Sequence, residues 1–248
     1  MLKLLEAIFA GRIQTEDIDT VGSKQFRGEL NCNTAQCDKC GECLKVCPVS
    51  AITINEYSRP IIDYKKCVFC GRCVEACTGC ALYHSNLEAL PEILANSSVD
   101  VGRVIDKKTG RSLHVRHLDA GSCNACDFEM GALSNPLYDL HRFGISFVAS
   151  PRHADVVMVT GVVTRNLEKA VHMTYEAMED PKVVIAVGAC AAGGATYGET
   201  YAIVGALDKV LPVDIFIPGC PPRPSAMIVA LLAAADLYLE RSKITVDK

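Results

Sequence analysis

The sequence predicts an α/β protein in two parts, a small α+β module dense in cysteine followed by a doubly wound parallel sheet. Two observations carry this prediction. Ten of the 14 cysteines lie between Cys32 and Cys80, and strand-like runs alternate with helical stretches from residue 111 onward. Alternation of strand, helix and strand is typical of a parallel sheet with helices on both faces. A chain of 248 residues is long enough for both parts.

The composition excludes several classes of protein. Half of the residues are hydrophobic and 22% are charged, so the chain is expected to fold. A net charge of −4 gives no reason to expect a nucleic-acid partner. We predict no signal peptide, because Glu6 interrupts the first apolar run, and no transmembrane helix, because the apolar stretch 226–237 is too short. Dense cysteine in a cytosolic chain indicates metal or redox cofactors rather than disulfides.

Cysteine density and turn residues divide the chain into four segments. We expect an N-terminal docking arm at 1–27, the cysteine module at 28–84, a linker at 85–110 and a larger domain at 111–248. In the arm, Leu2, Leu5 and Ile8 follow one side of an expected helix, a pattern that favours docking on a neighbouring subunit. In the linker we expect a short helix at 87–94, followed by turn residues.

The cysteine module contains an internal repeat. The pattern Cys-x2-Cys-x2-Cys-x3-Cys occurs twice, 30 residues apart, at Cys37, Cys40, Cys43 and Cys47 and at Cys67, Cys70, Cys73 and Cys77. Such a doubled pattern is typical of two 4Fe-4S clusters in which the fourth cysteine of each run binds the other cluster. We therefore assign one cluster to Cys37, Cys40, Cys43 and Cys77, and the other to Cys67, Cys70, Cys73 and Cys47. Zinc binding or inert buried thiols are the alternatives, but zinc ligands come in pairs at each end of a knuckle.

Two cysteines of the module, Cys32 and Cys80, fall outside the repeat. We interpret both as small buried hydrophobic residues. Cys80 lies close enough to Cys77 in the sequence to compete with it as a ligand, and Thr78 replaces the proline that follows Cys47. With its doubled motif, the module resembles a bacterial-type ferredoxin.

The larger domain is expected to hold five buried strands and two long helices. Short β-branched runs predict strands at 114–118, 145–148, 155–160, 183–187 and 213–217. Helical spacing predicts helices at 166–179 and 224–241. We expect the apolar part of the last helix, 226–237, to contribute to a face that a partner buries.

Four further cysteines follow strands of this sheet in glycine-rich loops. Cys123 and Cys126 follow the first strand, Cys190 follows the fourth, and Cys220 follows the fifth. Ligands of doubly wound sheets gather outside the carboxyl ends of the strands, so we expect these thiols to lie together. Their number fits a third 4Fe-4S cluster. Four unrelated buried thiols are the alternative.

These loops resemble the small electron-transfer subunit of energy-converting NiFe hydrogenases. That family includes the formate hydrogenlyase small subunit and is homologous to the complex I subunit that carries the terminal cluster. The resemblance rests on Gly-Ser-Cys-Asn-x-Cys-Asp-x-Glu at 121–129, Gly-Ala-Cys at 188–190 and Ile-Pro-Gly-Cys-Pro-Pro-Arg-Pro at 217–224. It implies a flavodoxin-like fold, a proximal 4Fe-4S cluster on the four cysteines, and a large partner subunit that holds a NiFe centre. The Cys123-x2-Cys126 spacing is the hydrogenase-like arrangement, because the complex I subunit carries adjacent cysteines.

We therefore expect an electron-transfer subunit of a membrane-associated, formate hydrogenlyase-like NiFe hydrogenase complex, with three 4Fe-4S clusters and no complete active site. No Walker loop, G-x-G-x-x-G after a strand or H-E-x-x-H accompanies the cysteines. Expected partners are the NiFe-type large subunit, membrane and electron-input subunits, and a soluble ferredoxin or formate dehydrogenase-type donor. The chain would be cytoplasmic, peripheral on the inner face of the cell membrane. The alternatives are a complex I-like oxidoreductase subunit without nickel, which serves a quinone or other acceptor, and a free-standing ferredoxin carrier.

Three other polar residues are candidates for a role near the third cluster. Glu129 could relay protons, or could be an acid that favours a helix N-terminus. Arg152 and His153 could tune the cluster, or Arg152 could pair with Asp155. The remaining histidines, His117 among them, show no ligand spacing and are expected to be ordinary.

Overall fold

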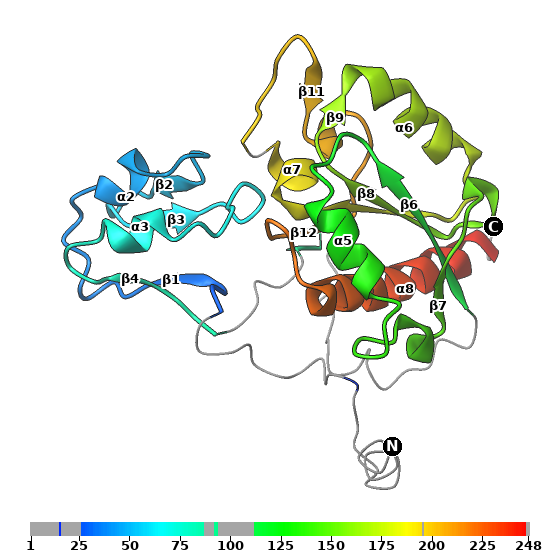
Figure 1. The fold of residues 1–248 in the computed structure, drawn as a ribbon, viewed down its shortest axis with the longest axis horizontal. Helices are drawn as coiled ribbons and strands as arrows, with labels where there is room; N and C mark the ends of the chain where they lie inside the picture. The colour runs from blue at the N-terminus through cyan, green and yellow to red at the C-terminus, as the bar shows by residue number, and fades with distance from the viewer. Residues whose placement is uncertain (1–14, 16–25, 87–91, 94–111, 195, 247–248) are drawn as a thin grey trace, which may run out of the picture.

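The computed structural model describes residues 15, 26–86, 92–93, 112–194 and 196–246, which form a small module beside a larger domain (Figure 1). Only Thr15, Phe26 and Arg27 of the predicted docking arm are described, so the arm helix lies outside the described residues. No described helix combines the length and the apolar character that crossing a membrane would require.

The cysteine module consists of two similar halves. Strand β1 (Leu30–Cys32) pairs antiparallel with β4 (Leu82–His84), and β2 (Ile52–Ile54) pairs antiparallel with β3 (Pro60–Ile62). The short helices α2 (Glu42–Lys45) and α3 (Arg72–Glu75) each follow a glycine with positive φ, Gly41 and Gly71. The 30-residue repeat of the sequence is therefore a repeat of structure.

The larger domain is built on a sheet whose strand order is β5-β12-β10-β8-β6-β7. Its five parallel strands are β6 (Leu113–Asp119), β7 (Ile145–Phe147), β8 (Val156–Thr160), β10 (Val183–Val187) and β12 (Ile215–Ile217). All five coincide with predicted strands. Counted along the chain, the parallel strands have the order 2-1-3-4-5, which is the flavodoxin-like order. The predicted fold class is confirmed.

Helices cover both faces of this sheet (Figure 1). Helices α5 (Ala125–Ala132) and α8 (Pro224–Val246) pack on one face, whereas α6 (Arg165–Ala177) and α7 (Gly188–Gly193) pack on the other. Alternate strand residues serve the two cores: Val156 and Met158 belong to the α8 side, and Val157 and Val159 to the opposite side. The sheet is thus buried on both faces, as a parallel sheet must be.

Smaller elements complete the domain. Strand β9 (Val163–Thr164) pairs antiparallel with β11 (Ile203–Gly205), and three 3-10 turns connect larger elements, namely η1 (Leu140–Phe143), η2 (Pro151–His153) and η3 (Leu207–Lys209).

Two predictions about apolar segments are wrong. The stretch 226–237, expected to meet a partner, is buried in the core of its own domain, where Leu231 and Ile228 are fully covered. The helix predicted at 87–94 is contradicted at Glu92–Ile93, which form strand β5 and pair antiparallel with β12. The rest of that predicted helix lies outside the described residues.

Asp214 joins three elements of the sheet domain. Its carboxylate accepts a hydrogen bond from the Val184 amide at 2.8 Å and pairs with the Arg241 guanidinium of α8, whose pKa this hydrogen bond raises. Asp214→Ala removes the acceptor for both donors, and we expect the free energy of unfolding to fall by about 2–3 kcal/mol in urea titrations. The exposed Asp208→Ala serves as control and should change it by less than about 0.5 kcal/mol. Equal effects of the two variants would contradict this role of Asp214.

Candidate functional site

Cysteines from both halves of the repeat line a first cavity in the module. They are Cys37, Cys40, Cys43 and Cys77. The amide of Ala81 donates a hydrogen bond to Cys77 Sγ at 3.3 Å. Cys80 is exposed and is not among the residues that line this cavity, so its predicted burial is wrong. The structure therefore brings Cys77, and not Cys80, to the first three cysteines of the other half.

The remaining four motif cysteines line a second cavity. They are Cys47, Cys67, Cys70 and Cys73. Burial raises the pKa of Cys73 to about 11, and the nearby charges of Cys67 and Cys70 add to this effect. The amide of Ala51 donates to Cys47 Sγ at 3.2 Å, as Ala81 does to Cys77 in the first cavity. Each fourth cysteine thus lies with the three cysteines of the opposite half, which is the grouping expected from the spacing.

Cys32 lies beside the first cavity. It is half-buried on β1, and its pKa is raised by burial and then by the charge and hydrogen bond of Cys37. The side chain is therefore a neighbour of one motif cysteine, which the sequence did not indicate.

The other four cysteines meet at the carboxyl edge of the sheet. Cys123 lies in the loop after β6, Cys126 in the first turn of α5, Cys190 in α7, and Cys220 in the loop after β12. Burial raises the pKa of Cys126 to about 12, and the charges of Cys190, Cys220 and Cys123 add to it. Burial also raises the pKa of Cys190 to about 11, with contributions from Cys220 and Cys123. The four thiols thus follow strands of one parallel sheet at its carboxyl edge, where the sheet topology predicted a ligand, and they influence one another's pKa.

Gly188 shapes the wall of this third group. Its φ is +80°, and a Cβ built on it would lie 2.8 Å from Cys126 Sγ. A larger residue would be strained and would occupy the space that the thiols share. The backbone of α7 therefore approaches the cysteines closely.

The chemistry of these donors fits iron–sulfur clusters. Within the described ranges, no three His, Cys, Asp or Glu side chains gather closely enough to hold one metal ion. Instead, twelve thiols form three groups of four, and thiolates are the ligands that hold iron–sulfur clusters. Backbone amides also donate hydrogen bonds to the sulfur atoms of Cys47 and Cys77, and hydrogen bonds to ligand sulfur are a common feature of iron–sulfur sites.

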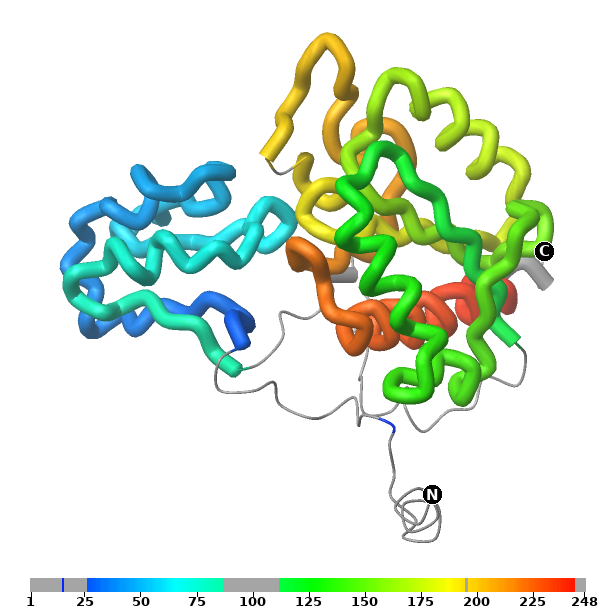
Figure 2. The backbone as a smooth tube through the Cα atoms, viewed as in Figure 1, coloured from blue at the N-terminus to red at the C-terminus, as the bar shows by residue number. Residues whose placement is uncertain are grey.

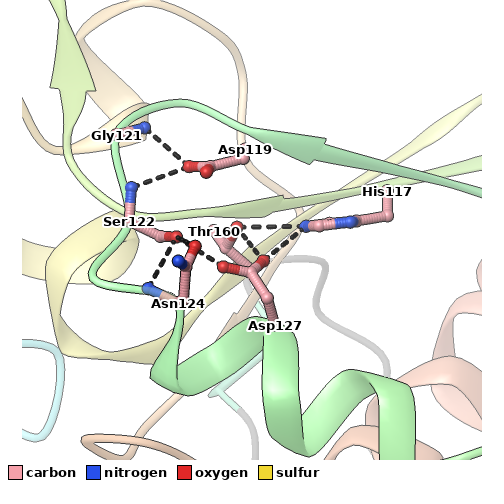
Figure 3. Close-up of polar contacts among 7 residues, drawn as sticks. All are labelled: His117, Asp119, Gly121, Ser122, Asn124, Asp127 and Thr160. Carbon is pink, nitrogen blue, oxygen red and sulfur yellow. Dashed lines mark hydrogen bonds and ion pairs between the residues drawn. The ribbon is translucent and has the colours of Figure 1, made fainter.

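A polar network supports the loop that carries Cys123 and Cys126 (Figure 3). Asp127 Oδ1 lies 2.8 Å from His117 Nε2 and accepts a hydrogen bond from the Thr160 hydroxyl at 2.8 Å. Its other oxygen accepts a hydrogen bond from the Ser122 hydroxyl. The network therefore joins β6, β8 and α5 directly behind the cysteine pair. His117, which was expected from the sequence to be ordinary, is a member of this network.

The start of the same loop is fixed by a second carboxylate. Asp119 Oδ1 accepts hydrogen bonds from the amides of Gly121 and Ser122 at 2.8 and 2.7 Å, and Ser122 Oγ accepts one from the Asn124 amide at 3.1 Å. Together the two carboxylates hold the backbone on both sides of Cys123.

We expect Asp127→Ala to weaken cofactor retention at the third group of cysteines. The change removes one acceptor shared by His117, Thr160 and Ser122, and loss of such a supporting residue typically costs roughly 10- to 100-fold in metal affinity. Iron release to a chelator, followed by absorbance, measures the effect. Ser134→Ala, at an exposed position after α5, is the control. Equal iron release from both variants would contradict the supporting role.

Cluster assembly on the iron-free chain is expected to release protons. The raised pKa values of Cys73, Cys126 and Cys190 keep these thiols protonated at neutral pH, whereas metal ligation requires thiolates. Loading should therefore be favoured as the pH rises from 7 toward 9, and proton uptake by a weak buffer during reconstitution measures it. Cys126→Ala should release fewer protons, and a pH-independent loading equilibrium would contradict the prediction.

The structure also locates the three polar candidates from the sequence, Glu129, Arg152 and His153. Glu129 is half-buried on α5. Arg152 and His153 are exposed in η2, which precedes β8, whereas the cysteines gather beyond the opposite, carboxyl end of the sheet. This position does not support the interpretation that Arg152 and His153 tune the third site.

Comparison with known proteins identifies both parts of the chain. The family described as NADH ubiquinone oxidoreductase, 20 Kd subunit, matches residues 123–234, and a 4Fe-4S dicluster domain matches residues 36–81. A probable membrane-bound hydrogenase subunit of Pyrococcus furiosus is 48% identical over 130 residues, which are 52% of this chain and 78% of that relative. The chain belongs to the 20 kDa oxidoreductase subunit family. In this member, a dicluster domain precedes the family domain.

Other relatives of this chain come from two kinds of oxidoreductase. Formate hydrogenlyase subunit 7 of Escherichia coli is 43% identical over 135 residues, or 54% of this chain and 53% of that relative. An NADH-quinone oxidoreductase subunit of Citrifermentans bemidjiense is 47% identical over 111 residues, or 45% of this chain and 65% of that relative. The chain thus spans about half the length of the first and slightly less than two thirds of the second. The predicted family and the ferredoxin module are confirmed.

Proposed function

We propose that this chain is the electron-transfer subunit of a membrane-associated, energy-converting NiFe hydrogenase complex of the formate hydrogenlyase type. The observation that carries the proposal is a third group of four cysteines at the sheet edge, in a chain related to a probable membrane-bound hydrogenase subunit and a formate hydrogenlyase subunit. The cysteine pair within this group has the hydrogenase-like spacing, Cys123-x2-Cys126.

Three 4Fe-4S clusters are proposed, each held by one group of cysteines. The ligands are Cys37, Cys40, Cys43 and Cys77; Cys47, Cys67, Cys70 and Cys73; and Cys123, Cys126, Cys190 and Cys220. When bound, such clusters take up and release one electron at a time. The chain itself binds them through thiolates, donates backbone hydrogen bonds to ligand sulfur and shields the buried thiols from water.

The third group is proposed to face the large subunit that holds the NiFe centre. Cys123 and Cys220 are exposed, and the neighbouring Phe128 of α5 is 80% exposed. A cofactor held by ligands this exposed would be accessible to another subunit. The other proposed partners are membrane and electron-input subunits and a soluble ferredoxin or formate dehydrogenase-type donor. Through these partners the chain would lie on the inner face of the cell membrane.

Purification of the complex through a tag on this chain tests the proposal. We expect about twelve iron atoms per copy of this chain, nickel in a co-purifying large subunit, and H2 evolution or uptake. A complex with no nickel and no reaction with H2 would overturn the hydrogenase proposal. An iron content of about eight atoms per chain would mean that the third cluster is absent.

The second candidate function is that of the equivalent subunit in a complex I-like oxidoreductase without nickel. The 47% identity to an NADH-quinone oxidoreductase subunit favours it. In that case the same purified complex would reduce a quinone or another acceptor, and would contain no nickel.

A further inference from the structure

The loop that connects β3 to α3 reaches from the cysteine module to the sheet domain. It carries Cys67 and Cys70, and in Figure 2 its cyan trace points at α7 and at the segment after β12. Val68 and Phe69 of this loop line a cavity together with Pro218, Cys220 and Arg223 of the sheet domain, among others. The second ferredoxin-type site and the third site therefore adjoin the same cavity.

Gly193, at the end of α7, allows this close approach. A Cβ built on Gly193 would lie 2.6 Å from the carbonyl oxygen of Lys65 and 2.8 Å from its carbonyl carbon. Gly193 has no positive φ, unlike the following Gly194 with φ +71°, so its backbone conformation does not require glycine. Since glycine also weakens a helix, the contact with Lys65 is the physical reason for a glycine at this position.

Side chains add to the contact. The Lys65 ammonium lies 4.1 Å from the centre of the Phe216 ring on β12, a cation–π interaction between the two parts of the chain. On the other side of the loop, Arg27 donates a hydrogen bond to the Cys70 carbonyl, and Arg223 lies 5.1 Å from the ring centre of Phe26. Backbone and side chains thus hold one loop of the module against the sheet edge.

The two ferredoxin-type sites differ in this respect among the described residues. Both of their cavities are lined within the module, but Val68 and Phe69 of the second cavity also line the cavity that contains Cys220, whereas no residue of the first cavity does. The two ferredoxin-type sites are therefore not equivalent toward the sheet domain, although the repeat makes them equivalent in sequence.

We infer that Gly193 and Lys65 are positioning residues, which hold the site of Cys47, Cys67, Cys70 and Cys73 next to the third site as its immediate partner in electron exchange. The inference rests on the proposed function and names the order of the sites within it. One electron leaves one site and enters the other, and no bond is made or broken. The first ferredoxin-type site is then the outer site, where electrons enter or leave the chain.

The test compares Gly193→Ala with Gly131→Ala in the purified complex. Gly131, on α5, has no atom within 4 Å of a built Cβ, so it is a matched control. In the fully reduced unmodified complex, electron paramagnetic resonance should show magnetic coupling between the third cluster and one ferredoxin-type cluster. We expect Gly193→Ala to weaken this coupling and to slow electron transfer between them roughly tenfold, since small misplacements have large effects on rate. Iron content and the signal of each cluster should not change.

A second variant, Lys65→Ala, removes the cation–π contact without adding an atom, and it should weaken the coupling in the same direction. If Gly193→Ala and Lys65→Ala keep both the coupling and the electron-transfer rate of Gly131→Ala, the positioning role is refuted. If the unmodified complex has no third cluster, the proposed function fails instead, so the two failures are distinguishable.

Discussion

Replacement of Cys126 by alanine is expected to remove the proposed third cluster and to abolish electron exchange with the proposed partner subunit. Among the four thiols at the sheet edge, Cys126 is the one that is buried, and burial together with the other three thiols raises its pKa to about 12. Without it, three ligands of unequal exposure remain. The iron content of the purified chain should fall from about twelve to about eight atoms, and H2-linked activity should fall to background.

The cysteine module provides the internal control for this variant. Its two cavities share no residue with the sheet edge, so both ferredoxin-type signals should persist in electron paramagnetic resonance. Retention of all the iron together with normal activity would show that Cys126 is not a ligand. Loss of all three signals would indicate a folding defect, and Cys126→Ser would then replace alanine in the experiment.

Much of the fold followed from local sequence, because a buried parallel strand is a short β-branched run. The strand predicted at 183–187 is β10 without any shift, and the last long helix begins at Pro224 as predicted. The sequence did not predict which surface buries that helix. A helix that is apolar all round has the same pattern whether it packs on its own sheet or on another protein. Strand β5 is two residues long and pairs with a strand more than 100 positions away, so no local pattern announced it.

The candidate site likewise has some features that the sequence predicted and others that it did not. Ligand spacing is local and the ends of parallel strands meet at one edge, so the three groups of cysteines could be expected before the structure. The network of His117, Asp127 and Thr160 could not, because its members come from β6, α5 and β8 and meet only when the strands align. The contact between Lys65 and Gly193 is equally non-local. Sequence spacing therefore predicted how the cysteines group, whereas the residues that hold the surrounding loops in place depend on the assembled fold.

The second large effect is expected from replacing Cys77 or Cys80, which compete in the sequence as the fourth ligand of the first ferredoxin-type cluster. Cys77 lines the first cavity and its sulfur accepts a hydrogen bond from the Ala81 amide, whereas Cys80 is exposed and has a positive φ of 50°. In the other half of the repeat, Ser50 occupies the position of Cys80 and has the same φ of 50°. The fold therefore does not require a cysteine at that position, because a serine occupies the same backbone conformation in the other half.

We accordingly expect Cys77→Ala to lose the first ferredoxin-type cluster, or about four iron atoms per chain, and Cys80→Ser to retain it. Iron analysis and electron paramagnetic resonance of the two purified variants measure the difference. Cys77→Ala should leave the second site with its four cysteines, because Cys47 and not Cys77 lines that cavity. The opposite result, with iron lost from Cys80→Ser and kept in Cys77→Ala, would assign the fourth ligand to Cys80 and would break the symmetry between the halves.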